Sequence, residues 1–124
     1  MATIKKFQDL ECWKTAQELL VSTYKILNKD ELRREYSFQD QMKRATISVS
    51  NNIAEGFERS SVKEKIRFLE FASGSISEVK SMLHAAVKLN FITEVEFDST
   101  FALAKKCQGQ IRAWMKYLYR LKNS

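Results

Sequence analysis

Seven side chains near the end of the chain recur at alternating spacings of four and three residues. They are Phe97, Phe101, Ala104, Gln108, Ile111, Met115 and Leu118. A repeat that averages 3.5 residues places them on one side of an α-helix and predicts left-handed, nearly antiparallel packing against other helices. The 124 residues include no proline and only three glycines, so few positions interrupt helices. We therefore expect an all-α protein.

Three earlier segments carry related apolar patterns. Residues 10–27 place Leu10, Trp13, Gln17, Leu20, Tyr24 and Leu27 at spacings of three and four. The second helix is expected from residue 37 to about 58–60. The third has a core face of Phe68, Leu69, Ala72, Ile76, Val79, Leu83 and Ala86, with the stem of Lys65. Residues 28–36 are polar and form a connection, with at most one helical turn. These segments predict one domain over residues 1–124, an up-down-up-down antiparallel four-helix bundle.

Short polar motifs predict where the helices begin and end. Asp9 is the expected N-cap of the first helix. Capping boxes are expected at Ser37 with Asp40, at Ser61 with Glu64, and at Thr93 with Glu96. Asn90 is expected to end the third helix in a left-handed conformation.

The second helix carries a stripe of polar side chains beside its apolar stripe. Its members are Gln41, Arg44, Ser48, Asn52 and Glu55, at spacings of 3, 4, 4 and 3. The stripe could hold a small polar ligand, or it could fix helix register and subunit orientation. We favour the second interpretation because the third helix supplies Gly74, Ser75 and Glu78 as counterparts. An ion pair between Arg44 and Glu78 is the specific expectation.

The third helix has a second face that a four-helix core does not explain. It comprises Arg67, Phe71, Gly74, Ser75, Glu78 and Met82. This face could be a wide flank of the core, or it could be a subunit interface in which small residues allow close approach and large apolar ones add contact area. Trp114 and Leu121 add further apolar surface. We expect a homo-oligomer with an interface at Arg67, Phe71, Gly74, Ser75 and Met82.

The net charge of +6 is concentrated at the end of the chain. Residues 99–124 contain six lysines and arginines and no acidic residue. Lys105, Arg112, Lys116 and Arg120 share one helical side, and Tyr119 at its edge could stack on a base. The pattern fits either a solvated helix face or a nucleic-acid-binding face, and repetition in an oligomer favours the latter. RNA or DNA is the expected partner; the alternative is an adaptor that recruits a protein partner.

Catalytic and metal-binding patterns are missing from the sequence. His84 is the only histidine, and Cys12 and Cys107 are far apart in sequence. These residues cannot supply a zinc site, and no nucleophile–base set stands out. We expect a non-enzymatic protein without a cofactor or metal. No segment suggests a signal peptide or membrane span, so a cytoplasmic location is expected.

Motifs spread over most of the chain resemble those of the 23S rRNA intervening-sequence proteins, also called four-helix-bundle or ribosomal-protein-like proteins. They are Phe7-x-Asp9-Leu10-x-x-Trp13, Gln41-x-x-Arg44-Ala45, Asn52-Ile-Ala-Glu-Gly56 and Gly74-Ser75. The resemblance implies a bacterial four-helix bundle that forms a homopentamer. It also implies a fold similar to the accessory proteins of diversity-generating retroelements, which are basic pentamers that bind nucleic acid and a reverse transcriptase. Ser50 stands where proline is frequent in the family, and the connection before residue 37 lacks the proline often found there.

Overall fold

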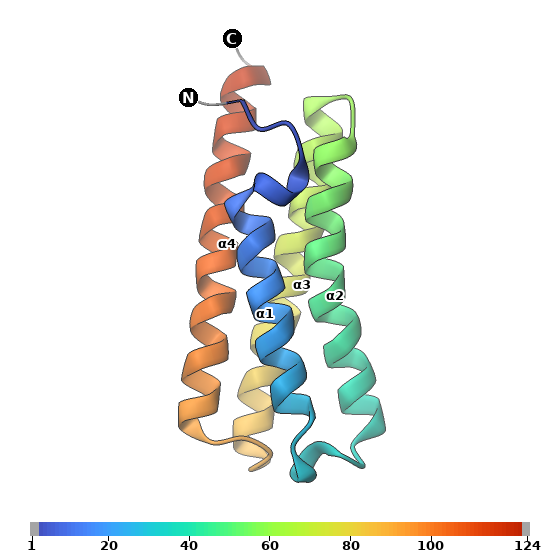
Figure 1. The fold of residues 1–124 in the computed structure, drawn as a ribbon, viewed down its shortest axis with the longest axis vertical. Coiled ribbons are helices and arrows are strands. Elements are labelled where there is room, and N and C mark those ends of the chain that lie inside the picture. Colours follow the sequence, from blue (N-terminus) through green and yellow to red (C-terminus); the bar gives the residue numbers. More distant parts are fainter. Residues whose placement is uncertain (1–2, 123–124) are drawn as a thin grey trace.

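Four antiparallel helices form the body of the molecule (Figure 1). In the computed structural model, which describes residues 3–122, they are α1 (Glu11–Leu27), α2 (Tyr36–Glu58), α3 (Val62–Lys88) and α4 (Glu94–Lys122). Two short 3-10 turns, η1 (Phe7–Asp9) and η2 (Asp30–Leu32), precede α1 and α2. The described part of the chain contains no strand. The all-α, up-down-up-down architecture expected from the sequence is confirmed.

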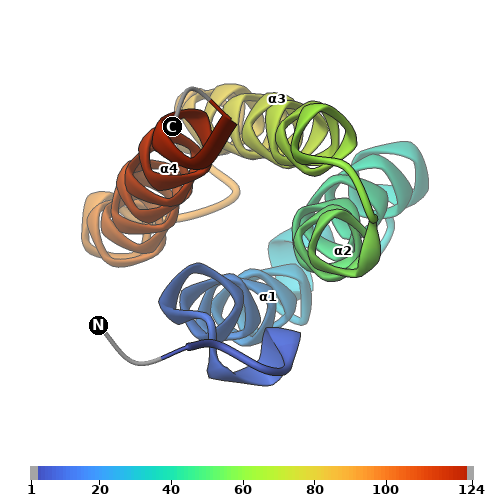
Figure 2. The same ribbon diagram turned by 90° about the horizontal axis from the view of Figure 1, so that it is seen from above.

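Each helix packs against two neighbours around a single core. Extensive contacts join α1 to α2, α2 to α3, α3 to α4 and α4 to α1. Consequently α1 lies diagonally opposite α3, and α2 lies diagonally opposite α4 (Figure 2). The core consists of aliphatic side chains that are almost fully buried, including Leu19, Met42, Val49, Ile53, Leu69, Ile76, Leu83 and Ile111. Burial of this apolar surface is the main force that holds the helices together.

The buried side of α1 differs from the expected one. The side chains that face the core include Cys12, Ala16, Leu19, Thr23 and Ile26. Tyr24, which belongs to the apolar pattern that was expected to be buried, is 39% exposed. The buried side chains have the same average spacing of 3.5 residues as the expected pattern, but they are displaced from it by about one position. The buried side includes the small side chains of Cys12, Thr15 and Ala16, whereas the bulkier Trp13 and Leu20 are only partly buried. The predicted phase was therefore wrong for the middle of the first helix, whereas Leu10 and Leu27 at the two ends of the pattern are buried as expected.

The helix ends confirm some of the expected caps and correct others. Ser61 Oγ accepts a hydrogen bond from the Glu64 amide at 3.1 Å, as expected. Asn90 has a φ of 62°, which is the left-handed helix end that was expected. Asp9 is not an N-cap, because it closes η1 and Leu10 precedes α1 instead. Ser37 does not cap α2, which begins one residue earlier, after Glu35.

Candidate functional site

The basic side of α4 faces solvent along its length. Lys105, Arg112, Lys116, Tyr119 and Arg120, which we call the basic face, are all exposed. No acidic residue follows Asp98 in α4. Within residues 3–122, no ion pair involves any of the four cations. The structure therefore brings the sequence-predicted residues to one surface and leaves their charges available to an anionic ligand.

Buried hydrogen bonds fix the inner side of α4 against α3. Gln108 is 7% exposed, and its Nε2 atom donates to the carbonyl and the hydroxyl oxygen of Ser73, both at 3.1 Å. Lys80 Nζ donates to Gln108 Oε1 at 2.8 Å. Because the Gln108 amide is satisfied from both ends, it costs little to bury. These bonds set the rotation of α4 and so direct the basic face outward.

Part of the polar stripe on α2 joins a network with α3. Ser75 Oγ donates to Ser48 Oγ at 2.9 Å. Asn52 Nδ2 donates to both the carbonyl oxygen and the hydroxyl oxygen of Ser48, each at 2.9 Å. Ser48, Asn52 and Ser75 therefore meet at the α2–α3 contact.

The expected ion pair between Arg44 and Glu78 is wrong for the single chain. Arg44 Nε instead contacts Asp40 Oδ2 at 2.9 Å, and the Arg44 side chain is 78% exposed. Asp40 lies one helical turn before Arg44, so it is reached without any contribution from α3. Glu78 and Gln41 are exposed. Glu55 is also exposed, and its carboxylate lies 3.9 Å from the Arg59 guanidinium.

The outer side of α3 is open. Phe71 is 46% exposed, with the Arg67 guanidinium 5.5 Å from the centre of its ring. An added Cβ at Gly74 would meet nothing within 4 Å. Met82 is partly buried and contacts the core. We refer to Arg67, Phe71, Gly74, Ser75 and Met82 as the α3 face, which combines a large aromatic side chain with small residues.

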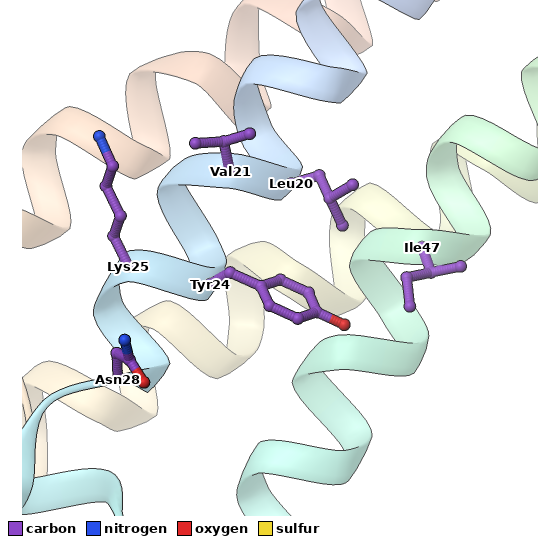
Figure 3. Close-up of a pocket in the computed structure, with 6 residues that line it drawn as sticks. All are labelled: Leu20, Val21, Tyr24, Lys25, Asn28 and Ile47. Atoms are coloured by element: carbon purple, nitrogen blue, oxygen red, sulfur yellow. The ribbon is translucent and has the colours of Figure 1, made fainter.

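A second apolar surface lies between α1 and α2 and was missed by the sequence reasoning. Leu20, Val21 and Tyr24 of α1 and Ile47 of α2 line a hollow of about 500 Å³, which we call the α1–α2 groove. Figure 3 shows Tyr24 extending from α1 toward the helix that carries Ile47. Val21 is 54% exposed and Ile47 39% exposed. The signal was present, since Leu20 and Tyr24 were placed in the seam and a shift of one position moves them to the surface.

Three residues were considered for catalysis or metal binding, and each contacts other residues of the bundle: His84, Cys12 and Cys107. His84 packs its ring against Phe97 and Phe101, with centroids 4.8 and 5.3 Å away. The Cys107 thiol approaches the Cys12 carbonyl oxygen at 3.4 Å. Burial raises the pKa of Cys12 to about 11 and the pKa of Cys107 to about 12. Both thiols are therefore protonated at neutral pH, when they are poor nucleophiles.

Comparison with known families identifies the chain. The model of the 23S rRNA-intervening sequence protein family matches residues 8–113. The chain belongs to this family. No curated protein matches the sequence. A solved structure from Bacteroides thetaiotaomicron, a protein of unknown function from the S23 ribosomal protein family, has the same fold with a TM-score of 0.78. It is 20% identical and covers 85% of this chain and 98% of its own. Within the part of this family member that the structure describes, no helix is long and apolar enough to cross a membrane.

Proposed function

We propose that this 23S rRNA-intervening sequence family protein is a non-enzymatic, cytoplasmic homo-oligomer that binds structured RNA or DNA through the basic face of α4. The observation that carries the proposal is the set of four exposed cations without an ion-pair partner among the described residues. When such side chains neutralise phosphates, condensed counterions are released and binding becomes favourable. The family description refers to 23S rRNA, which favours RNA as the first ligand to test.

The dimensions of the basic face suit a nucleic-acid backbone. With a rise of about 1.5 Å per residue, the segment from Lys105 to Arg120 extends over about 22 Å. This length spans several phosphates of either a single strand or a duplex. Tyr119 is 44% exposed at the edge of the face, where its ring can stack on an unpaired base.

Assembly is the second part of the proposal. The α3 face and the α1–α2 groove are two different apolar surfaces on one chain. When one surface of a copy binds the other surface of the next copy, the contact is heterologous and can close into a ring. Resemblance to the family supports a ring of five. Each added copy would repeat the basic face and contribute its own net charge of +6.

The α1–α2 groove also supports a second candidate function. In this alternative the groove receives a protein partner in place of a neighbouring copy, and the positive charge serves solubility alone. Such an adaptor would not bind nucleic acid. The two functions therefore differ in a direct binding measurement.

The test is a salt titration of binding to a structured RNA and to duplex DNA. Four phosphate contacts predict that affinity falls about 100-fold between about 50 and 200 mM salt. The quadruple variant Lys105→Glu, Arg112→Glu, Lys116→Glu and Arg120→Glu should lose binding while it keeps the wild-type helical content and oligomeric state. Fluorescence anisotropy with labelled RNA measures the affinity.

A matched control reverses four exposed lysines elsewhere. The substitutions Lys5→Glu, Lys6→Glu, Lys14→Glu and Lys63→Glu cause the same change in net charge but leave α4 intact. This variant should retain most of the affinity if the basic face is the binding site. An equal loss of affinity in the two variants would show that binding depends on the overall charge and not on the basic face. If the wild-type protein at micromolar concentration binds neither the RNA nor the DNA at low salt, the adaptor is the remaining candidate function.

A further inference from the structure

A cluster of polar side chains lies at the contact between α3 and α4. Ser73, Ser77 and Lys80 of α3 surround the amide group of Gln108 of α4, and we call these four residues the α3–α4 cluster. Gln108 Nε2 donates to Ser77 Oγ at 3.2 Å as well as to Ser73. Gln108 Oε1 accepts from Lys80 Nζ at 2.8 Å. The cluster therefore carries one positive charge and no carboxylate.

The ammonium group of Lys80 has no anionic partner in the described part of the chain. Lys80 is partly buried, and within residues 3–122 it donates one hydrogen bond, to the neutral Gln108 Oε1, and forms no ion pair. Lys29, which is partly buried as well, instead contacts the Glu96 carboxylate at 2.6 Å. A partly desolvated charge is unfavourable without a counter-charge, so an anion bound at Lys80 would stabilise it.

Lys80 lies beside the basic face of α4. Its Nζ atom is 2.8 Å from Gln108 Oε1 and 5.4 Å from the centre of the Phe101 ring. Lys105 stands between these two residues in the sequence of α4, about one helical turn from each, and Arg112 lies one turn beyond Gln108. Lys80, Lys105 and Arg112 are therefore neighbours along the α3–α4 contact.

A phosphate group matches the donors that this place offers. The ammonium group of Lys80 has three N–H donors, of which Gln108 uses one. Ser77 is exposed, and its hydroxyl group accepts from Gln108 and can still donate. The neighbouring basic face continues the positive charge over about 22 Å along α4. A row of cations of this length favours a polyanion over a single carboxylate.

We infer that Lys80, held in place by Gln108, binds a phosphate of the nucleic-acid backbone. The inference rests on the proposed function and extends the binding surface from α4 onto α3. Lys80 is then a fifth cation in contact with the ligand, beside the four of the basic face. The backbone of the ligand follows the contact between α3 and α4.

The test measures how the affinity for a labelled structured RNA depends on salt in the wild type and in Lys80→Gln. Glutamine removes the charge but keeps an N–H donor for Gln108. The loss of one phosphate contact should weaken binding about 10-fold at about 50 mM salt. It should also reduce the slope of log affinity against log salt by about one. A purely structural effect would weaken binding but leave this slope unchanged, because the number of released counterions would stay the same.

Two further variants separate the charge of Lys80 from its packing and from charge elsewhere. Lys80→Arg keeps the charge and should keep the wild-type slope. Lys43 is the matched control, because it is also partly buried and its Nζ atom lies 5.5 Å from the centre of the Tyr24 ring. It belongs to α2, diagonally opposite α4 (Figure 2). Lys43→Gln should therefore keep the wild-type affinity and slope.

Circular dichroism and light scattering verify that each variant keeps its fold and oligomeric state. If the wild type binds RNA and Lys80→Gln binds it with the same affinity and slope, the inference is overturned and the proposed function stands. The inference is also overturned if Lys43→Gln lowers the slope as much as Lys80→Gln, or if Lys80→Arg does so. If the wild type binds no RNA, both the inference and the proposed function are overturned.

Discussion

Gly56 lies near the C-terminal end of α2, where its backbone packs against α3. A Cβ added there would lie 3.0 Å from Phe68 Cβ and 3.2 Å from the Lys65 carbonyl oxygen. The carbonyl belongs to a helix backbone and cannot move aside easily. We predict that Gly56→Ala lowers the free energy of unfolding by about 1–2 kcal/mol, because overpacking outweighs the better helix propensity of alanine. Urea denaturation followed by circular dichroism measures this change.

Gly109 provides the matched control for this prediction. It lies inside α4, and an added Cβ there would meet nothing within 4 Å. Gly109→Ala should therefore stabilise the protein by up to about 1 kcal/mol through helix propensity alone. If Gly56→Ala were as stabilising as Gly109→Ala, the close approach would not constrain residue 56.

Individual side-chain partners were predictable only where the register of two helices decides them. The polar stripe that includes Ser48 was matched as a whole to a set on the third helix that includes Ser75, and the hydroxyl groups of these two serines do meet. Arg44 was matched to Glu78 by the same reasoning, but a carboxylate on its own helix was nearer. A long, exposed side chain can form contacts of similar free energy with several partners, so sequence spacing does not determine which contact it makes.

At the scale of the element, the start of α4 is tied to the connection that follows α1. The Glu96 amide donates to Thr93 Oγ1 at 3.1 Å, and the Thr93 amide donates to Glu96 Oε1 at 2.8 Å, which completes the expected capping box. Lys29 Nζ lies 2.6 Å from the same Oε1 atom. The hydrogen bond from Lys29, with that from the Thr93 amide, lowers the pKa of Glu96 below its ordinary value of 4.5.

This lowered pKa predicts an acid-sensitive contribution to stability. A carboxyl group with a lower pKa in the folded state stabilises the fold above the unfolded pKa and loses that effect as pH falls through the folded pKa. We predict that Glu96→Gln lowers the free energy of unfolding by about 0.5–1 kcal/mol at pH 7. The difference from wild type should shrink as pH falls below about 4.5, the ordinary value. Urea denaturation at several pH values measures it.

Glu94 offers a control in the same helical turn. It is exposed in the first turn of α4 and makes no ion pair with Lys29 in the described structure. Glu94→Gln removes an equal charge near the same helix end, so it accounts for the helix-dipole contribution. If Glu94→Gln reproduced the pH-dependent loss of Glu96→Gln, the Lys29 contact would not be its cause.

The sequence determines which side of α4 faces the core, but it does not determine which side of α1 does so. In α4 the side opposite the apolar repeat carries lysines and arginines, so only one rotation buries apolar side chains. In α1 two apolar stripes one position apart satisfy the same 3.5-residue repeat. Packing against α2 and α4 selects the stripe with smaller side chains, which is a property of the assembled bundle. The α1–α2 groove is the direct result of that selection.

At the scale of the whole molecule, the proposed surfaces occupy different sides of the bundle. The α1–α2 groove lies next to the side of α2 that faces α1. The α3 face lies next to the side of α2 that faces α3, where Ser75 Oγ donates a hydrogen bond to Ser48 Oγ. The basic face lies on α4, diagonally opposite α2 (Figure 2). A ring built through the two apolar surfaces would thus leave α4 uncovered, so assembly and nucleic-acid binding are compatible on one chain.

A heterologous ring makes a prediction that a two-fold symmetric dimer does not. Phe71→Glu places a charge in the α3 face, and Val21→Glu places one in the α1–α2 groove. Each variant alone should be monomeric, because every contact in a ring uses both surfaces. A mixture of the two variants should form one-to-one dimers that grow no further. The intact groove of the Phe71→Glu chain can bind the intact α3 face of the Val21→Glu chain, but the remaining surfaces are both defective.

Light scattering coupled to size-exclusion chromatography measures these masses. Val95→Glu serves as the control, since Val95 is 78% exposed at the start of α4 and belongs to neither surface. It should retain the wild-type mass. If the mixture stayed monomeric while each variant remained folded, the two surfaces would not be partners. If either variant alone kept the wild-type mass, its surface would lie outside the interface. A mixed dimer of limited size would establish the pairing, because only complementary surfaces restore one contact and no more.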